Sequence, residues 1–310
     1  MKRYIYAVDV GGSSIKYGVF TYDGKLLRSF KKRTPKSKSP EAFLEEIANT
    51  IKHQSEPLNE VIGVGFGLPG PVIDDTVYGA VNLGWKTVNV KAIFSQFFEE
   101  DLFVVLENDA NIASFGEALY GAGASYKDMV LFTLGTGIGG GVIHNGSIVS
   151  GAHGAGGEVG HITVDHTYNF TCGCGRKGCV ETLASATGLK NLVKYFLKHE
   201  TFDTSIKTSR VSAKQVIDLA KEGDALALKV VDEMALGLAK AASAVSVITD
   251  PEVFVLGGGI SDAGAFFTDK VASHYKRLVF KPVVSTEFIN ARLGNKAALY
   301  GAFALVKHHA

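Results

Sequence analysis

The stretch YIYAVDVGGSSIKYGVFT (residues 4–21) sets a pattern for the chain: a β-rich run, a glycine turn and a second β-rich run. Residues 128–149 repeat this order, with the turn Gly135-Thr-Gly137 between two apolar runs. A glycine turn between two such runs is typical of a β-hairpin. We therefore interpret the two stretches as copies of one β–turn–β unit, and expect a fold that contains an internal duplication.

Helical patterns alternate with apolar runs over the rest of the chain. Helices are expected over residues 41–53, 93–100, 110–120, 185–199, 212–221, 225–249, 263–278 and 296–307. Further strands are expected over residues 25–32, 61–68, 102–106, 253–256 and 282–285, and residues 74–90 are expected to be irregular. Strands that alternate with helices predict an α/β fold with mixed sheets.

The composition is that of an ordinary globular protein. With 310 residues the chain is long enough for two domains or one large one. The formal net charge of +1 gives no reason to expect nucleic acid or an anionic membrane as a partner. The N-terminus reaches Asp9 too early for a signal peptide, and no apolar run approaches the roughly 20 residues that span a bilayer. We expect a cytoplasmic protein.

Three glycine turns follow predicted strands: Asp9-Val-Gly-Gly12, Leu134-Gly-Thr-Gly137 and Gly257-Gly-Gly259. Open α/β sheets bind ligands at the carboxyl ends of their strands, and glycine turns let backbone N–H groups approach phosphates closely. None of the three turns fits the Walker A pattern or the Gly-X-Gly-X-X-Gly pattern of dinucleotide sites. A nucleotide would have to bind by another route, with Asp9 holding Mg²⁺ directly or through water.

The pair Asn108-Asp109 lies at the end of a predicted strand, immediately before a predicted helix. Asp109 in this place is often just the N-cap of the helix. It could instead be a general base that takes a proton from a sugar hydroxyl. The local sequence does not separate these two interpretations.

All three cysteines lie in one stretch, Cys172-Gly-Cys174-Gly-Arg-Lys-Gly-Cys179, with His161 upstream. Three cysteines cannot all pair, so a disulfide framework is not expected. The cluster predicts a tetrahedral Cys₃His zinc site, structural rather than catalytic because no coordination position stays open. The alternative is a set of reduced, buried cysteines and a core histidine. A zinc ion would fix His161, and with it Glu158 and Glu181, in one polar patch suited to a sugar.

These motifs occur in the order seen in the ROK family (repressors, open reading frames and kinases), which the chain resembles over nearly its whole length. The most specific parts are Glu158-Val-Gly-His161 and the run from Cys172 to Glu181, and Gly151–Glu158 with Asn82-Leu-Gly-Trp85 is most similar to bacterial ROK glucokinases. The resemblance implies an ATP-dependent sugar kinase. It also implies the actin-like ATPase (ribonuclease H-like) fold, with two domains of mixed β-sheets flanked by helices and a cleft between them.

The domain boundaries follow from the same resemblance. We expect a smaller N-terminal α/β domain over residues 1–110, completed by a C-terminal helix at about 296–310, and a larger α/β domain with the zinc loop over residues 111–295. Because water could attack ATP as readily as a sugar does, we expect the domains to close around the sugar. A homodimer is expected from the family alone.

The resemblance implies a role for each matching residue. Asp109 would be the catalytic base. The hexose would be bound by Gly70, Asn82, Asn108, Asp109, Glu158, His161 and Glu181. ATP would be held by Asp9, Gly11, Gly12, Ser13, Thr136, Gly137, Gly258 and Gly259. Zinc would be bound by His161, Cys172, Cys174 and Cys179, and Mg²⁺ by Asp9. Ser13 stands where many members have threonine, and it keeps the hydroxyl.

Glucose is the favoured substrate, and the product would be glucose 6-phosphate. N-acetylmannosamine, N-acetylglucosamine, mannose, fructose and allose are the alternatives, because single hydroxyl differences are read by pocket shape. A non-enzymatic sugar sensor or repressor of the same family is the alternative from another class. The first strand begins by Tyr4, which leaves no room for a preceding helix-turn-helix domain, and the net charge of +1 supplies no basic face. Both features weigh against a repressor.

Overall fold

The structure is a computed structural model that describes residues 3–36, 39–99 and 101–310. The chain forms two compact units. Unit 1 consists of Met1–Tyr120, Ile148–Gly156 and Asn295–Ala310, and unit 2 consists of Gly121–Ser147 and Gly157–Gly294. None of the described helices is both long and apolar enough to cross a membrane.

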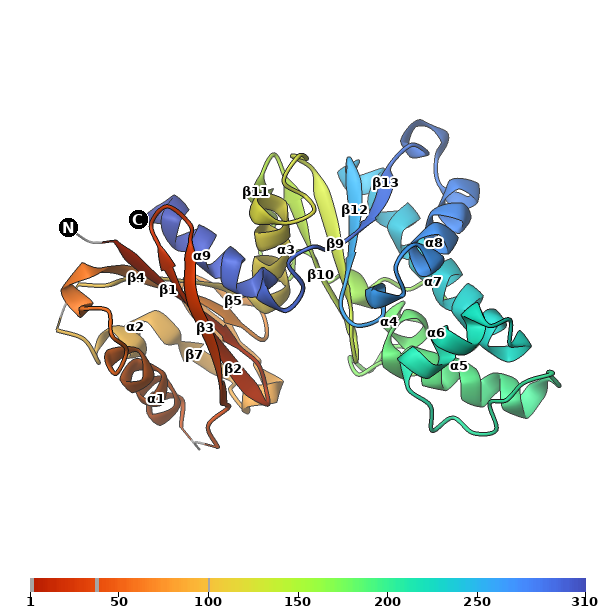
Figure 1. Ribbon diagram of the computed structural model, residues 1–310, viewed down its shortest axis with the longest axis horizontal. Helices are drawn as coiled ribbons and strands as arrows, with labels where there is room; N and C mark the ends of the chain where they lie inside the picture. The colour runs from red at the N-terminus through yellow and green to blue at the C-terminus, as the bar shows by residue number, and fades with distance from the viewer. Residues whose placement is uncertain (1–2, 37–38, 100) are drawn as a thin grey trace. The chain divides into compact units, whose positions relative to one another are not determined.

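Two five-stranded sheets share one topology (Figure 1). The first has the order β3-β2-β1-β4-β8, and its strands are Leu26–Arg33, Ser14–Thr21, Tyr4–Val10, Val61–Leu68 and Phe103–Asn108. The second has the order β11-β10-β9-β12-β13, and its strands are Ser147–Ile148, Ile138–His144, Met129–Leu134, Val253–Gly257 and Glu287–Asn290. In both sheets an antiparallel hairpin is followed by two parallel neighbours. The predicted internal duplication is confirmed.

The sheet of unit 1 is covered by helices on both faces. Its helices are α1 (Pro40–Lys52), α2 (Val90–Ser95), α3 (Asp109–Tyr120) and α9 (Ala297–His309). Buried side chains of α1 and α2 form one apolar core with the sheet, including Phe43, Phe94 and Phe66. Helix α9 lies against the sheet so closely that a Cβ on Gly65 would lie 2.2 Å from the Ala302 carbonyl oxygen.

Helix α3 belongs to unit 1, whereas the expected domain boundary at residue 110 would have put it in the other unit. The reason is its backbone contact with α9. A Cβ added to Gly116 would lie 2.1 Å from the Ala297 carbonyl oxygen, and one added to Gly301 would lie 1.8 Å from that of Ile112. The two glycines let the helices touch backbone to backbone, which no pattern within either helix reveals.

Unit 2 contains the helices α4 (Glu181–Ala184), α5 (Ala186–His199), α6 (Ala213–Lys221), α7 (Ala225–Thr249) and α8 (Ala265–Leu278). Helix α7 contributes the largest share of buried residues to the core of this unit. It ends at Thr249, and the next residue, Asp250, caps it in the left-handed conformation with φ 43°.

Three local predictions are wrong. Residues 74–90 are not irregular, because they contain β6 (Thr76–Tyr78) and β7 (Thr87–Asn89), which form a small sheet with the preceding β5 (Val72–Ile73). Residues 281–283 form a 3₁₀ turn, and the strand expected at 282–285 lies at β13 instead. The helix expected over residues 93–100 begins earlier, because the Asn89 side chain accepts the Ala92 N–H and starts α2 at Val90; Glu100 lies outside the described residues.

Candidate active site

The first glycine turn joins β1 to β2 in unit 1. The Gly11 N–H donates to the Ser14 carbonyl oxygen at 3.0 Å, which closes the turn. Thr34, which follows β3, stabilises this turn with two hydrogen bonds. Its hydroxyl donates to the Gly11 carbonyl oxygen at 2.6 Å, and its backbone N–H donates to the Ser13 carbonyl oxygen at 3.1 Å. Thr34 was not predicted, and only the pairing of β2 with β3 brings it here.

Asp9 has a partner that the sequence analysis missed. Asp9 and Lys16 lie opposite each other in the β1–β2 ladder, and the Lys16 Nζ donates to Asp9 Oδ2 at 2.8 Å. The pair could have been predicted from the hairpin register, since opposite residues point to the same face. Any Mg²⁺ at Asp9 would have to share this carboxylate with the ammonium group.

Asn82 lies beside the same turn. A Cβ added to Gly12 would lie 3.2 Å from the Asn82 Cβ, so the two residues are in contact. Asn82 belongs to a 3₁₀ turn, Val81–Leu83, and is exposed. A residue predicted to bind the hexose therefore stands next to the turn predicted to bind phosphate.

Asn108, not Asp109, caps helix α3. Its Oδ1 accepts the N–H groups of Ala110 at 2.9 Å and of Asn111 at 3.2 Å, the second of which is the i+3 bond of an N-cap. Asp109 is the first residue of the helix and is partly exposed, with Oδ1 at 2.9 Å from the Ala110 N–H. The N-cap interpretation of Asp109 is therefore wrong, and its carboxylate is not needed to start the helix.

The other side of the Asn108 amide connects to the Pro-Gly-Pro loop. Asn108 Nδ2 donates to the Gly70 carbonyl oxygen at 3.2 Å. Gly70 has φ 105°, a backbone conformation that favours glycine. The structure thus brings Gly70 and Asn108 together at the carboxyl ends of β4 and β8. Among the described residues Asn108 Nδ2 has this one acceptor, although its amide carries two hydrogens.

The second glycine turn lies in unit 2 and ends where β10 begins at Ile138. Only Gly135, Thr136 and Gly137 form the turn, which the Gly135 N–H closes on the Gly137 carbonyl oxygen at 3.0 Å. The start of α5 supports it: the Thr187 hydroxyl donates to the Thr136 carbonyl oxygen at 2.8 Å.

Glu181 lies against this second turn. Its Oε2 accepts the Ile138 N–H at 3.0 Å, and a Cβ added to Gly137 would lie 2.2 Å from the same oxygen. Gly137 is therefore required for the approach of the carboxylate. The other oxygen, Oε1, accepts the Cys172 S–H at 3.2 Å. A predicted sugar ligand thus connects the second glycine turn to the cysteine cluster.

The third turn lies beside the second. Gly258 follows β12 with φ 84°, and a Cβ there would lie 2.5 Å from the Leu134 carbonyl oxygen. The Ile260 N–H donates to that same oxygen at 3.2 Å. Since β9 and β12 are parallel neighbours, Gly258-Gly259 and Gly135–Gly137 end at one edge of the second sheet.

The predicted zinc ligands converge. The ligand atoms of His161, Cys172, Cys174 and Cys179 all lie within 4.8 Å of one another. Tetrahedral zinc, with bonds of about 2.3 Å to sulfur and about 2.0 Å to nitrogen, requires S···S near 3.8 Å and S···N near 3.5 Å. Cys174 Sγ and Cys179 Sγ are 3.7 Å apart, and Cys172 Sγ lies 3.6 Å from His161 Nδ1. These distances fit a zinc site.

The environments of the thiols differ. Burial, assisted by the neighbouring Glu181, raises the pKa of Cys172 to about 12. A hydrogen bond from the Arg176 backbone lowers the pKa of the exposed Cys174 to about 6. A bound Zn²⁺ would hold all three sulfurs as thiolates. Arg176 also stabilises the loop, because its Nη2 donates to the His161 carbonyl oxygen at 2.9 Å.

His161 turns its second nitrogen toward Glu158. With Nδ1 facing the sulfurs, Nε2 lies 3.9 Å from Glu158 Oε2. This separation is too long for a direct hydrogen bond, and both side chains are partly exposed. A metal on Nδ1 would fix the tautomer with the proton on Nε2. The pair then offers one donor and one acceptor to a hydroxyl group.

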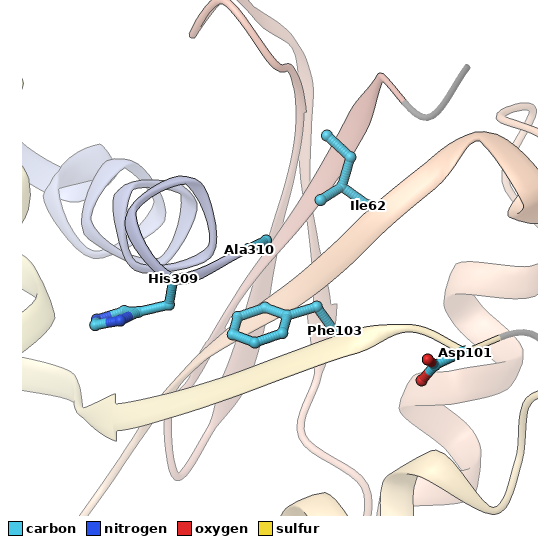
Figure 2. A pocket seen from close by; sticks show the side chains of 5 residues that line it. All are labelled: Ile62, Asp101, Phe103, His309 and Ala310. Carbon is cyan, nitrogen blue, oxygen red and sulfur yellow. The ribbon is translucent and has the colours of Figure 1, made fainter.

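A pocket of about 320 Å³ in unit 1 contains none of the predicted site residues (Figure 2). It is lined by Ile62, Asp101, Phe103, His309 and Ala310. Ile62 and Phe103 lie near the beginnings of β4 and β8, whereas Gly70 and Asn108 follow or end these strands. The pocket therefore lies at the end of the sheet opposite to the predicted catalytic and sugar-binding residues.

Comparisons with known proteins identify the family of this chain and several of its relatives. The model of the ROK family matches residues 5–309. A glucokinase of Halalkalibacterium halodurans is 37% identical over 98% of this chain and 95% of its own, and a glucokinase of Thermotoga maritima is 32% identical over 99% and 98%. The structure of a ROK family glucokinase from Streptomyces griseus in complex with glucose and AMPPNP is similar with a TM-score of 0.77 and 32% identity, over 98% of this chain and 99% of its own.

Proposed function

Because the chain belongs to the ROK family and has its actin-like ATPase fold, we propose that it is an ATP-dependent hexose kinase that phosphorylates glucose. Near-full-length similarity to glucokinases supports the substrate. The proposed mechanism rests on the position of Asp109. Asp109 is the first residue of helix α3, whereas the side chain of Asn108 forms the N-cap. Its carboxylate lies at the carboxyl end of β8, the position proposed for the general base.

In the proposed reaction Asp109 takes the proton of the glucose 6-hydroxyl as its oxygen attacks the γ-phosphorus of ATP. The new O–P bond forms while the bond to ADP breaks, and the proton ends on the Asp109 carboxylate. Phosphoryl transfer needs alignment and charge neutralisation more than covalent help from the protein. Backbone N–H groups of the turns at Gly12, Gly137 and Gly258 would position the phosphates and the adenosine side.

Sugar recognition would use a mixed set of donors and acceptors. Glu158 and Glu181 accept from hydroxyl groups, and His161 Nε2 and the remaining Nδ2 hydrogen of Asn108 donate to them. Buried polar groups left without their partner make such a site selective, because each unmatched group costs about 1–3 kcal/mol. Kinases for mannose, fructose, allose or N-acetylated hexoses remain the alternatives within this class.

Two metals are part of the proposal. The four ligands of the cysteine cluster fit zinc, which would fix His161 and hold the loop that carries Glu181. Mg²⁺ would neutralise phosphate charge when bound, with Asp9 as its nearest carboxylate at the first turn. We further propose a homodimer, from family membership, and a cytoplasmic location, because the reaction consumes ATP.

The experiment that tests this function is an ADP-release assay with Mg-ATP and a panel of glucose, mannose, fructose, N-acetylglucosamine and N-acetylmannosamine. We expect the highest kcat/KM for glucose. A preference for an N-acetylated hexose would keep the kinase mechanism and replace the substrate. A folded, zinc-containing protein that turns over none of these sugars would overturn the proposal in favour of a sugar sensor.

A further inference from the structure

A buried carboxylate lies directly before the catalytic pair. Glu107 is the penultimate residue of β8 and is 9% exposed. Among the described residues no lysine, arginine or histidine forms an ion pair with it. Burying an ionised carboxylate is costly unless hydrogen bonds compensate. The hydrogen bonds that Glu107 accepts therefore indicate its role in the structure.

One oxygen of Glu107 holds the first turn of α3. Oε1 accepts the Asn108 N–H at 2.7 Å and Asn111 Nδ2 at 3.2 Å. These two residues flank the Asp109–Ala110 step, and Asn111 is itself bonded through its N–H to the Asn108 side chain. The turn that carries Asp109 is thus fixed on both sides by one carboxylate oxygen.

The amide of Asn111 shows how strongly this bond is preferred. Asn111 is 1% exposed, and its Oδ1 has no hydrogen-bond partner within the part of the chain that the structure describes. Leaving a buried acceptor unpaired costs about 1–3 kcal/mol. Asn111 nevertheless has the orientation in which its Nδ2 donates a hydrogen bond to Glu107 Oε1.

The other oxygen of Glu107 holds a loop from a distant part of the chain. Oε2 accepts the Ser150 hydroxyl at 2.6 Å. The loop that begins there folds back on itself, because the Gly156 N–H donates to the Ser150 carbonyl oxygen at 2.8 Å. It also touches β5, where a Cβ on Gly154 would lie 2.7 Å from the Val72 carbonyl oxygen. The proposed sugar ligand Glu158 follows this loop two residues after Gly156.

We propose that Glu107 is a positioning residue, which fixes the turn that carries Asp109 and the Ser150–Gly156 loop relative to each other. This inference rests on the proposed function, in which Asp109 is the base. Glu107 acts by accepting hydrogen bonds. Glutamine can keep the same geometry, because its carbonyl oxygen replaces Oε1 and its amide donates to the Ser150 oxygen, whereas alanine removes every bond.

The test is steady-state kinetics of Glu107→Gln, Glu107→Ala and Ser150→Ala with glucose and ATP. Displacing a reacting group by about 1 Å can cost about 100-fold in rate, so we expect Glu107→Ala to lose about 100-fold in kcat with the ATP KM within about 2-fold. Glu107→Gln should recover to within about 10-fold of the wild type. Ser150→Ala should raise the glucose KM by about 5–10-fold and leave the ATP KM unchanged.

The control is Ser114→Ala. Ser114 is a fully buried serine of helix α3, and its hydroxyl donates to the Ala110 carbonyl oxygen rather than to Glu107. It should keep wild-type kcat and both KM values. Thermal melting and circular dichroism of each variant show whether it is folded.

Three results would overturn the inference in an active wild-type enzyme. The first is a folded Glu107→Ala variant whose kcat stays within about 3-fold of the wild type. The second is a Glu107→Gln variant whose kcat falls as far as that of Glu107→Ala. The third is a Ser150→Ala variant whose glucose KM equals that of Ser114→Ala. If Glu107→Ala does not fold, the glutamine and Ser150 variants still decide. Failure of the proposed function is a separate result, because it would show as an inactive wild type or a fully active Asp109→Asn.

Discussion

Glu181 places one carboxylate oxygen 3.2 Å from Cys172 Sγ and the other 3.0 Å from the Ile138 N–H. One side chain therefore connects the cysteine cluster to the second glycine turn. The Cys172 thiol donates its proton to Glu181 Oε1, and a zinc-bound thiolate would have no proton to give. Zinc at the cluster would leave that oxygen of Glu181 to a sugar hydroxyl.

Cys174→Ser should therefore impair glucose binding as well as metal binding. We expect less than one zinc per chain by elemental analysis, a lower thermal midpoint, and a glucose KM that rises far more than the ATP KM. Lys177→Ala is the control, since Lys177 is exposed in the same loop and is not a ligand. One zinc per chain retained by Cys174→Ser would contradict the ligand set.

Asp109→Asn should abolish turnover without abolishing binding. The amide cannot accept the hydroxyl proton, so we expect kcat to fall by about 10³-fold or more with glucose affinity within about 3-fold. Calorimetry with glucose and the ADP-release assay measure the two effects separately. Because Asn108 rather than Asp109 caps helix α3, the variant should melt close to the wild type. A kcat near that of the wild type would remove the role of base.

Local signals predicted much of this molecule. Glycine turns after β-rich runs gave both hairpins, and the repeat of that pattern gave the duplicated sheet topology. The cysteine cluster was also predictable, because all three thiols lie in one short loop and only His161 comes from outside it.

Contacts between distant residues were not predictable in the same way. Ser150 and Glu107 are 43 residues apart, and no local pattern in either stretch indicates the bond. Asn108 and Asp109 are both good helix caps, and the local sequence did not indicate that Asn108 is the one that caps helix α3. Lys16 could have been paired with Asp9 once the hairpin register was known.

Gly301→Ala should destabilise unit 1 strongly. The new Cβ would lie 1.8 Å from the Ile112 carbonyl oxygen, and backbone of a packed helix cannot move aside cheaply. We expect a loss of about 3 kcal/mol or more, seen as a lower thermal midpoint. The control is Gly237→Ala in helix α7, where the nearest atom is the Leu183 Cδ1 at 3.2 Å, the flexible end of a side chain. Equal melting of the two variants would contradict the close contact of α3 and α9.

The ion pair of Glu56 predicts a pH-dependent contribution to stability. Burial raises the pKa of Glu56, but hydrogen bonds from Arg28 and Tyr6 outweigh it and lower the pKa overall. A carboxyl with a lowered folded-state pKa stabilises the protein above its unfolded value of about 4.3, and this stabilisation disappears as the pH falls through the folded-state pKa.

Glu56→Gln should therefore cost about 1–2 kcal/mol at pH 7 and progressively less as the pH falls from about 4.3 through the lower folded-state pKa of Glu56. The Arg28 side chain is 34% exposed, so solvent screens the ion pair. The expected loss of free energy of unfolding is therefore at the low end for a charged hydrogen bond. Thermal melting of wild type and variant from pH 7 to pH 3.5 measures the difference. Glu45→Gln, an exposed position on helix α1, is the control and should show no such trend. A constant difference between wild type and Glu56→Gln across this range would mean that the charge of Glu56 contributes nothing to stability.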